Sequence, residues 1–176
     1  MPARKQTPYY HKFVELGAEL ADRIGFDAAV RFTTTEEEHR ATREAAGLYD
    51  VYYQGPIDVK GKGATALLQR LLINDLERID DGGVIYSSMC NDEGGMLDDM
   101  TVYRLSGEHY WIIATPSRVA LIEQWVTEHA RDMNAYVTNC VSGTAYLSLQ
   151  GPKSREILGR LTDADLSTGA LPYYRL

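Results

Sequence analysis

The stretch of sequence that decides the fold is Tyr86-Ser-Ser-Met-Cys-Asn-Asp-Glu-Gly-Gly-Met-Leu-Asp-Asp-Met-Thr-Val-Tyr-Arg-Leu105. It contains two runs of residues that favour strands, joined by Asn91-Asp-Glu-Gly-Gly95, whose two glycines are free to adopt positive φ angles. The pattern predicts a β-hairpin with strands over residues 84–90 and 97–105. The second strand carries Asp98 and Asp99, whose side chains point to opposite faces because strand side chains alternate.

Asp98 and Asp99 are the side chains in this stretch that best suit chemistry. Asp99 shares its face with Thr101 and Tyr103, and Asp98 shares the other face with Met100. Neither face is purely polar, so each carboxylate is expected to be partly desolvated, which suits hydrogen bonding or proton transfer. The alternative is a structural role, in which a carboxylate accepts backbone N–H groups at the end of the hairpin.

The segments on both sides of the hairpin predict an alternation of strands and helices. From residue 56 onward, apolar periodicity predicts the order β-α-β-β-β-α-β-β-α. The other expected segments are a strand at 57–59, a helix over 64–72, and strands at 110–114, 136–140 and 144–149. A further helix is expected to have Thr115 as its N-cap and Pro116 at N1. The last helix is expected to begin at Gly151-Pro152 and to turn Ile157, Leu158 and Leu161 inward. This order contains the split β-α-β arrangement of ferredoxin-like α+β folds, with helices on one face of a mainly antiparallel sheet.

The first fifty residues predict an N-terminal helical segment. Apolar residues at helical spacing predict an amphipathic helix over residues 9–23, interrupted by Gly17 and followed by a short strand over 26–32. Thr35 and Glu38 have capping-box spacing and predict the start of a second helix. The residues after this helix, from 48 to 53, favour a strand.

Composition and charge exclude several classes of protein. The 176 residues include 18 Lys+Arg and 25 Asp+Glu, a formal net charge of −7, whereas a nucleic-acid-binding protein needs a basic surface. With 44% apolar residues the chain can form a packed core. No run of about 18 apolar residues is present to span a membrane, and the polar N-terminus lacks the apolar segment of a signal peptide. Cys90 and Cys140 have neither zinc nor disulfide spacing, so we expect a cytoplasmic protein.

Two further patterns bear on candidate sites. Gly61-Lys-Gly-Ala-Thr-Ala66 follows a strand and opens a helix, as a dinucleotide-binding loop does. Such loops belong to parallel sheets, whereas hairpins are expected here, so we interpret these glycines as turn residues. The four histidines have no metal-ligand spacing, and no metal site is expected.

The stretch from residue 86 to 105 resembles the central motif of the glycine-cleavage T-protein family. Further blocks resemble the same family in the same order: Thr7-Pro-Tyr-Tyr10 with Val14-Glu-Leu-Gly17, Arg43-Glu-Ala-Ala-Gly-Leu-Tyr-Asp-Val51, Leu67-Leu-Gln-Arg-Leu-Leu-Ile-Asn-Asp75, Leu149-Gln-Gly-Pro-Lys-Ser-Arg155 and Leu171-Pro-Tyr-Tyr174. The family consists of tetrahydrofolate-dependent aminomethyltransferases, related to folate-dependent demethylases. The resemblance thus implies an enzyme, a transferase that moves an aminomethyl or methyl group to tetrahydrofolate.

The resemblance also implies which residues form the site. Asp99 matches the aspartate that contacts the folate and is most tied to catalysis, and Tyr86 and Tyr103 match tyrosines of the folate pocket. Gln54 lies where the family has a Ser-His-Met-Gly-Glu segment, which reads Tyr52-Tyr-Gln-Gly-Pro56 here. Thr115 replaces a common asparagine. Both positions are implied to lie near the folate.

The resemblance covers nearly the whole chain, yet family members continue beyond it. It implies that residues 1–50 begin the first domain, that 51–142 form a ferredoxin-like α+β domain, and that 143–176 return to the first domain. The expected partners are a missing C-terminal half of the fold and a one-carbon donor, either a small methylated or aminomethyl compound or a lipoyl carrier protein. The alternative function is a non-catalytic folate-binding or assembly module on the same fold.

Overall fold

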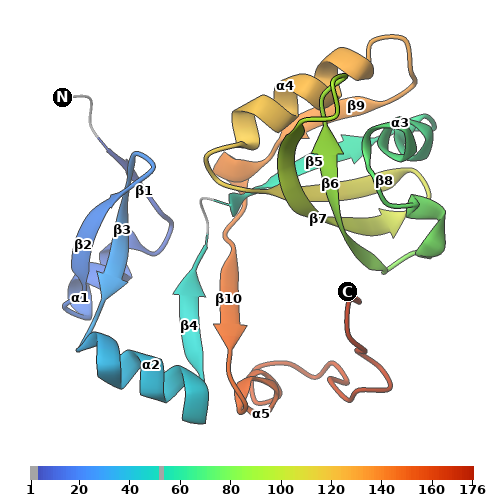
Figure 1. Cartoon of the computed structure of the whole chain (residues 1–176). Helices are drawn as coiled ribbons and strands as arrows, with labels where there is room; N and C mark the ends of the chain where they lie inside the picture. The colour runs from blue at the N-terminus through green and yellow to red at the C-terminus, as the bar shows by residue number, and fades with distance from the viewer. Residues whose placement is uncertain (1–3, 52–53) are drawn as a thin grey trace. The chain divides into compact units, whose positions relative to one another are not determined.

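The computed structural model of the chain describes residues 4–51 and 54–176 (Figure 1). These residues form two compact units. The sheet unit comprises residues 54–144 and 171–176, and the N-terminal unit comprises residues 4–51 and 145–170. Tyr52 and Tyr53, part of the segment that is implied to lie near the folate, fall outside the described residues.

The sheet unit is built on an antiparallel sheet in the spatial order β6-β7-β8-β5-β9. Its described strands are β5 (Pro56–Lys60), β6 (Val84–Cys90), β7 (Met96–Ser106), β8 (His109–Ala114) and β9 (Tyr136–Asn139). Helices α3 (Ala64–Leu71) and α4 (Val119–His129) cover one face of this sheet, as Figure 1 shows. Short 3₁₀ helices lie at Leu76–Arg78 and Val141–Gly143. The predicted α+β class and helix-covered antiparallel sheet are confirmed.

Apolar packing holds α3 and α4 against the sheet. Ile57 of β5 and Val102 of β7 are fully buried, as are Leu68 of α3 and Ile122 of α4. Burying one such side chain contributes about 1.5–3 kcal/mol. Neither helix has a side-chain hydrogen bond at its N-cap, so the burial of these apolar side chains, rather than capping, stabilises the two helices.

The N-terminal unit contains two small sheets within its described residues. One sheet has the order β1-β3-β2, formed by β1 (Lys5–Gln6), β2 (Glu19–Arg23) and β3 (Phe26–Arg31). The other pairs β4 (Gly47–Asp50) with β10 (Leu147–Gln150), which joins segments far apart in the sequence. The helices are α1 (Tyr10–Glu15), α2 (Thr35–Glu44) and α5 (Ser154–Leu158).

The predicted helix over residues 9–23 is correct only in its first half. Helix α1 ends before Gly17, whose φ of +73° breaks the helical path. Residues Glu19–Arg23 form a strand because they pair with β3 through a tight turn at Ile24 and Gly25. These two residues have φ values of +55° and +79°, and a two-residue hairpin loop of this kind needs positive φ at both positions.

The start of α2 lies one residue before the predicted one. Thr34, not Thr35, is the N-cap: its hydroxyl accepts the Glu37 N–H at 3.2 Å, and the Glu37 carboxylate accepts the Thr34 N–H at 3.2 Å. Glu38 instead accepts the backbone N–H of Phe32, which lies two residues before the N-cap. Consecutive Thr and Glu residues make two capping registers possible, and the contacts of Glu38 select one of them.

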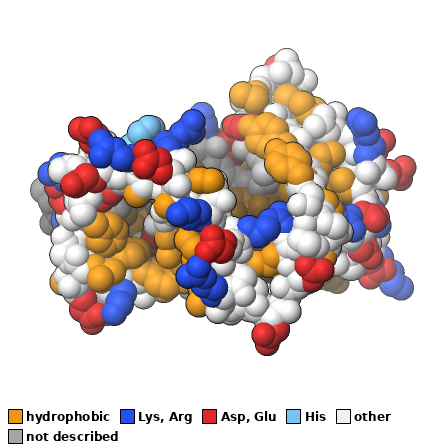
Figure 2. All heavy atoms as spheres, turned by 90° about the horizontal axis from the view of Figure 1, so that it is seen from below, with side chains coloured by type: hydrophobic (Ala, Val, Ile, Leu, Met, Phe, Trp, Pro, Cys, Tyr) orange, Lys and Arg blue, Asp and Glu red, His pale blue; other side chains and the backbone are white. Residues whose placement is uncertain are grey.

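The two later helices also differ from prediction. Thr115 and Pro116 do not start α4 but form a turn, closed by a 2.7 Å hydrogen bond from the Arg118 N–H to the Thr115 carbonyl, with proline at its favoured second position. In the C-terminal part, Leu158 and Leu161 are 41% and 78% exposed, so the expectation that they point inward is wrong for this chain. Figure 2 shows hydrophobic side chains at the surface beside charged ones.

Candidate functional site

Strand β7 places the two neighbouring aspartates on opposite faces of the sheet. Asp98 is only 6% exposed, on the face covered by α3 and α4 together with Met100 and Val102. Asp99, Thr101 and Tyr103 alternate with them and are half-buried. We call the side of the sheet that carries these three residues the Asp99 face. The alternation predicted from the sequence is confirmed.

Tyr86 binds Asp99 directly. Strand β6 pairs with β7 so that Tyr86 lies opposite Thr101 and Ser88 lies opposite Asp99. From this diagonal position the Tyr86 hydroxyl donates a hydrogen bond to Asp99 Oδ2. This hydrogen bond is the main cause that raises the pKa of Tyr86 above its ordinary value, with desolvation second. Tyr86 therefore remains a neutral donor at physiological pH, and Asp99 acts as the acceptor.

Two more tyrosines approach this pair. Tyr103 lies on the Asp99 face, opposite Trp111 of β8 in the register. Tyr174 comes from the C-terminal segment, where its carbonyl accepts the Val84 N–H at 2.9 Å. A hydrogen bond with the Tyr173 side chain is the main cause that raises the pKa of Tyr174, and the Tyr103 phenol contributes. The structure thus adds Tyr174, which sequence reasoning did not include among the site residues although Leu171-Pro-Tyr-Tyr174 carried a family block.

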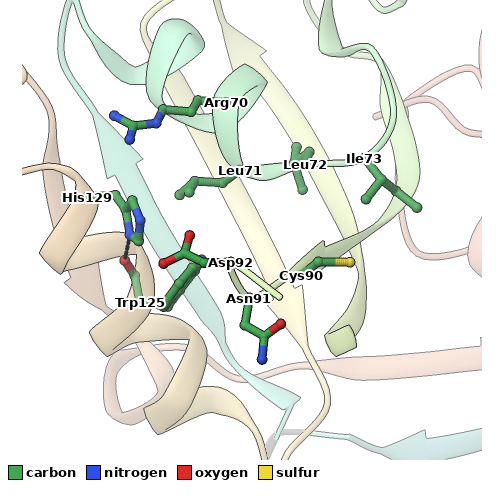
Figure 3. A pocket seen from close by; sticks show the side chains of 9 residues that line it. All are labelled: Arg70, Leu71, Leu72, Ile73, Cys90, Asn91, Asp92, Trp125 and His129. Carbon is green, nitrogen blue, oxygen red and sulfur yellow. Dashed lines mark hydrogen bonds between the residues drawn. The ribbon is translucent and has the colours of Figure 1, made fainter. Parts of the chain in front are cut away.

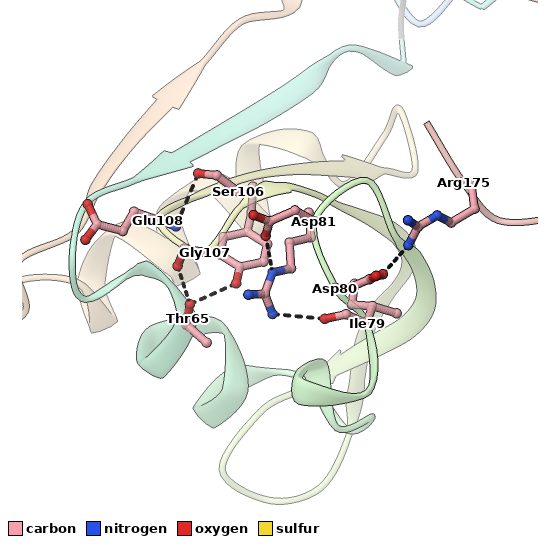
Figure 4. Close-up of polar contacts among 10 residues, drawn as sticks. Thr65, Ile79, Asp80, Asp81, Ser106, Gly107, Glu108 and Arg175 are labelled. Carbon is pink, nitrogen blue, oxygen red and sulfur yellow. Dashed lines mark hydrogen bonds and ion pairs between the residues drawn. The ribbon is translucent and has the colours of Figure 1, made fainter. Parts of the chain in front are cut away.

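The C-terminal segment is fastened beside β6 by polar contacts (Figure 4). Arg175 forms an ion pair with Asp80, and the Leu176 N–H donates to the Gly82 carbonyl at 2.8 Å. In the same loop, Arg104 of β7 donates to Asp81 at 2.8 Å and to the Ile79 carbonyl at 2.9 Å. These contacts position the backbone of Tyr174, whose φ of +60° is uncommon for a residue with a side chain.

Thr115 and Gln54 lie near the same end of the sheet as Asp99. The Thr115 N–H donates to Asp98 Oδ2 at 2.8 Å, beyond the last register pair of β7 with β8, Met100 with Ala114. Gln54 precedes β5 by two residues, and the first register pair of β5 joins Pro56 to Ile113. Among the described residues, the Gln54 side chain makes no hydrogen bond with Asp99 or Tyr86. The structure therefore joins Tyr86 with Asp99, ties Thr115 to Asp98, and leaves Gln54 without such a link.

The glycines of the loop before α3 allow close contacts with neighbouring backbone segments. The Gly63 N–H donates to the Asn134 carbonyl at 2.7 Å, and the Gly61 N–H donates to the Glu108 carbonyl at 2.9 Å. A Cβ on Gly61 would lie 2.4 Å from the Asn134 oxygen. Backbone carbonyls thus occupy the N–H groups that a dinucleotide phosphate would need, and the glycines permit this close approach.

The Asp99 face offers an acceptor beside aromatic rings. One carboxylate oxygen of Asp99 takes the Tyr86 hydroxyl, and the other has no hydrogen-bond donor among the residues described. A carboxylate so placed can accept an N–H group of a ligand or stabilise a developing positive charge. In the described part of the chain, no group of three or more His, Cys, Asp or Glu residues could hold a metal ion. No helix there is long and apolar enough to cross a membrane.

Known proteins are similar to this chain in both sequence and structure. The chain is 38% identical over 170 residues to an aminomethyltransferase of Chloroherpeton thalassium and 39% identical over 171 residues to one of Caldanaerobacter subterraneus. In each case the match covers 97% of this chain and 46% of the relative, so the chain spans about half the length of the curated relatives it matches. A crystal structure of the glycine cleavage system aminomethyltransferase T from Bartonella henselae is similar to it, with a TM-score of 0.80 and 25% identity over 89% of this chain and 43% of that one. The family model described as GCVT N-terminal domain matches residues 9–176, and the chain therefore belongs to this aminomethyltransferase family.

Proposed function

We propose that this chain is the tetrahydrofolate-binding part of an enzyme that transfers an aminomethyl group to tetrahydrofolate. The observation that carries the proposal is the hydrogen-bonded pair of Tyr86 and Asp99 on a sheet face that also bears Tyr103. The relatives named aminomethyltransferase support the reaction class. The chemistry of the donor set suits a folate, because a planar ring with N–H groups needs an acceptor at its edge and aromatic side chains at its face.

Each site residue then has a defined task. Tetrahydrofolate, when bound, supplies the nitrogen that accepts the one-carbon unit. Asp99 accepts an N–H group of the ligand and stabilises positive charge that develops during transfer. Tyr86 donates to the other oxygen and thereby sets the orientation of the carboxylate. Tyr103 and Tyr174 provide aromatic walls, while Gln54 and Thr115 border the ligand at the end of the sheet.

The proposal also covers the rest of the site and the donor of the one-carbon unit. The relatives extend beyond the matched region, and ligand pockets need groups that converge from several sides. We therefore propose that the active protein includes a further C-terminal half. This chain alone would then bind folate without catalysing the transfer. The donor is an aminomethylated lipoyl carrier protein or a small methylated or aminomethyl compound.

Calorimetry with tetrahydrofolate tests the role of Asp99. We expect Asp99→Ala to weaken binding by about tenfold to a hundredfold, because a hydrogen bond to a charged group contributes roughly 1.5–3 kcal/mol. Asp132→Ala, at an exposed carboxylate of the turn after α4, should leave binding unchanged. Equal affinity of the wild-type and Asp99→Ala chains would remove Asp99 from the site.

A product assay separates a transferase from a non-catalytic binding module. The longer protein that contains this chain is supplied with tetrahydrofolate and, separately, with an aminomethylated lipoyl carrier protein and a panel of methylated amines. A transferase forms methylene-tetrahydrofolate and ammonia from the aminomethylated carrier, whose thiol is released, or methyl-tetrahydrofolate and the demethylated amine from a methylated amine, and Asp99→Ala lowers the rate. Intact folate binding without product from any donor would favour the module.

A further inference from the structure

A pocket lies apart from the Asp99 face. It has a volume of about 260 Å³ and opens between the C-terminal end of α3, the hairpin loop after β6 and the C-terminal half of α4 (Figure 3). Both helices pack on the face of the sheet opposite Asp99. Pockets for drug-sized ligands usually measure about 300–1,000 Å³, so this one suits a smaller molecule.

The apolar floor and the loop of this pocket are held in place by backbone contacts. Leu71 and Leu72 are 8% and 7% exposed, and Leu72 forms an isolated bridge with Met89 of β6. In the loop, the Asn91 side chain accepts the Gly95 N–H at 2.6 Å, which sets the path of the chain through Asp92. The site is therefore formed before a ligand arrives, which lowers the entropy cost of binding.

Side chains of opposite charge border the pocket from separate elements. Arg70 on α3 and Asp92 in the loop form no ion pair with any residue that the structure describes. On α4, His129 Nδ1 lies 2.8 Å from the Trp125 carbonyl, so this nitrogen donates, and Nε2 is the ring nitrogen that remains for other contacts. Figure 3 shows the Asp92 carboxylate and the His129 ring turned toward each other.

Trp125 adds an aromatic wall with an unused donor. Its ring lies 4.3 Å from that of His129, centroid to centroid. Its indole N–H is buried and has no acceptor within the described part of the chain.

We propose that this pocket binds a small zwitterion, a free amino acid with an apolar side chain. The Asp92 carboxylate fits an ammonium group, and the Arg70 guanidinium fits a carboxylate. Leu71 and Leu72 receive the apolar side chain. A ligand with a single charge would leave either Arg70 or Asp92 without its counterpart, whereas a zwitterion pairs both. This proposal does not depend on the function assigned to the Asp99 face.

NMR of the two indole N–H groups tests the proposal on the intact chain. Trp125 reports on the pocket, and Trp111, on β8, is the internal reference. The probes are L-leucine, 4-methylpentanoate, which lacks the ammonium group, and 3-methylbutylamine, which lacks the carboxylate. We expect leucine to shift the Trp125 signal saturably and to bind about tenfold more tightly than either truncated probe, since each lost charge-assisted contact contributes roughly 1.4 kcal/mol or more.

Substitutions of exposed residues complete the test without endangering the fold. Arg70→Gln and Asp92→Asn should each weaken leucine binding about tenfold. Arg78→Gln, at an exposed arginine outside the pocket, is the matched control and should bind as the wild type does. The proposal is overturned if leucine leaves the Trp125 signal unmoved, if the three probes bind equally, or if Arg70→Gln and Asp92→Asn bind as tightly as Arg78→Gln.

Discussion

Asp98 and Asp99 differ by one position and occupy different environments. Asp98 is buried beside the helices and accepts the backbone N–H of Thr115, which is the structural role considered from the sequence. Asp99 accepts only a side-chain hydroxyl, that of Tyr86, among the described donors. The structural alternative thus describes Asp98, whereas the chemical role of Asp99 stays a prediction.

The hydrogen bond between Tyr86 and Asp99 should be visible in the titration of Tyr86. We expect Asp99→Asn to lower the pKa of Tyr86 toward the ordinary tyrosine value of about 10, because the charged acceptor that favours the protonated phenol is lost. The titration is followed through the ring carbon signals of labelled tyrosine, with Tyr136, which is 70% exposed, as the reference. An unchanged titration of Tyr86 would show that the two side chains do not bind each other in solution.

At the scale of elements, helix α2 depends on its cap because none of its residues is buried. We expect Thr34→Ala to destabilise α2 by about 1 kcal/mol, the usual cost of removing an N-cap side chain. Thr35→Ala is the matched control, since Thr35 lies inside the helix and should cost less. Amide hydrogen exchange of α2 measures both effects. Equal losses for the two variants would contradict the capping register at Thr34.

The C-terminal segment should detach from β6 in acid. The Arg175 guanidinium lowers the pKa of Asp80, mainly through a hydrogen bond. A carboxyl whose pKa is lowered on folding contributes stability above its unfolded pKa, about 3.9 for aspartate, and loses it as the pH falls through the lowered folded value. We therefore expect the Leu176 amide, bonded to the Gly82 carbonyl, to lose protection as the pH falls below about 3.9.

Asp80→Asn provides the control for this acid effect. It should weaken protection of the Leu176 amide at neutral pH and remove the change in acid, because no carboxyl is then left to titrate at this position. Protection that falls in acid to the same extent in Asp80→Asn would assign the effect to another group.

At the scale of the whole molecule, the two units differ in how much apolar surface they bury. Among the described residues, the buried apolar side chains of the N-terminal unit are Phe26 and Ala28, whereas the sheet unit has a continuous core. Amide exchange should therefore be slower in β5, β7 and β8 than in β2 and β3, since local opening costs more where more contacts must break. The domain boundaries expected from the sequence, after residues 50 and 142, stay predictions.

A core substitution tests whether the units respond separately. Leu68→Ala should reduce the unfolding free energy of the sheet unit by about 2–5 kcal/mol, because a fully buried leucine leaves a cavity. Leu161→Ala, at a side chain that is 78% exposed, should change stability by less than about 0.5 kcal/mol. Exchange in β2 and β3 is expected to stay the same in Leu68→Ala. An equal acceleration there would show that both units unfold together.

The sequence by itself determined the order of elements from residue 56 onward, the two faces of β7 and the family resemblance. These features depend on local rules, because side-chain alternation and apolar periodicity are properties of neighbouring residues. The tertiary structure alone decided which threonine caps α2, that Thr115 turns toward Asp98 instead of starting α4, and that Tyr174 lies beside β6. Each of these outcomes depends on hydrogen bonds with partners outside the local pattern, such as Glu38 with Phe32 or Val84 with Tyr174, and no periodicity in the sequence specifies those partners.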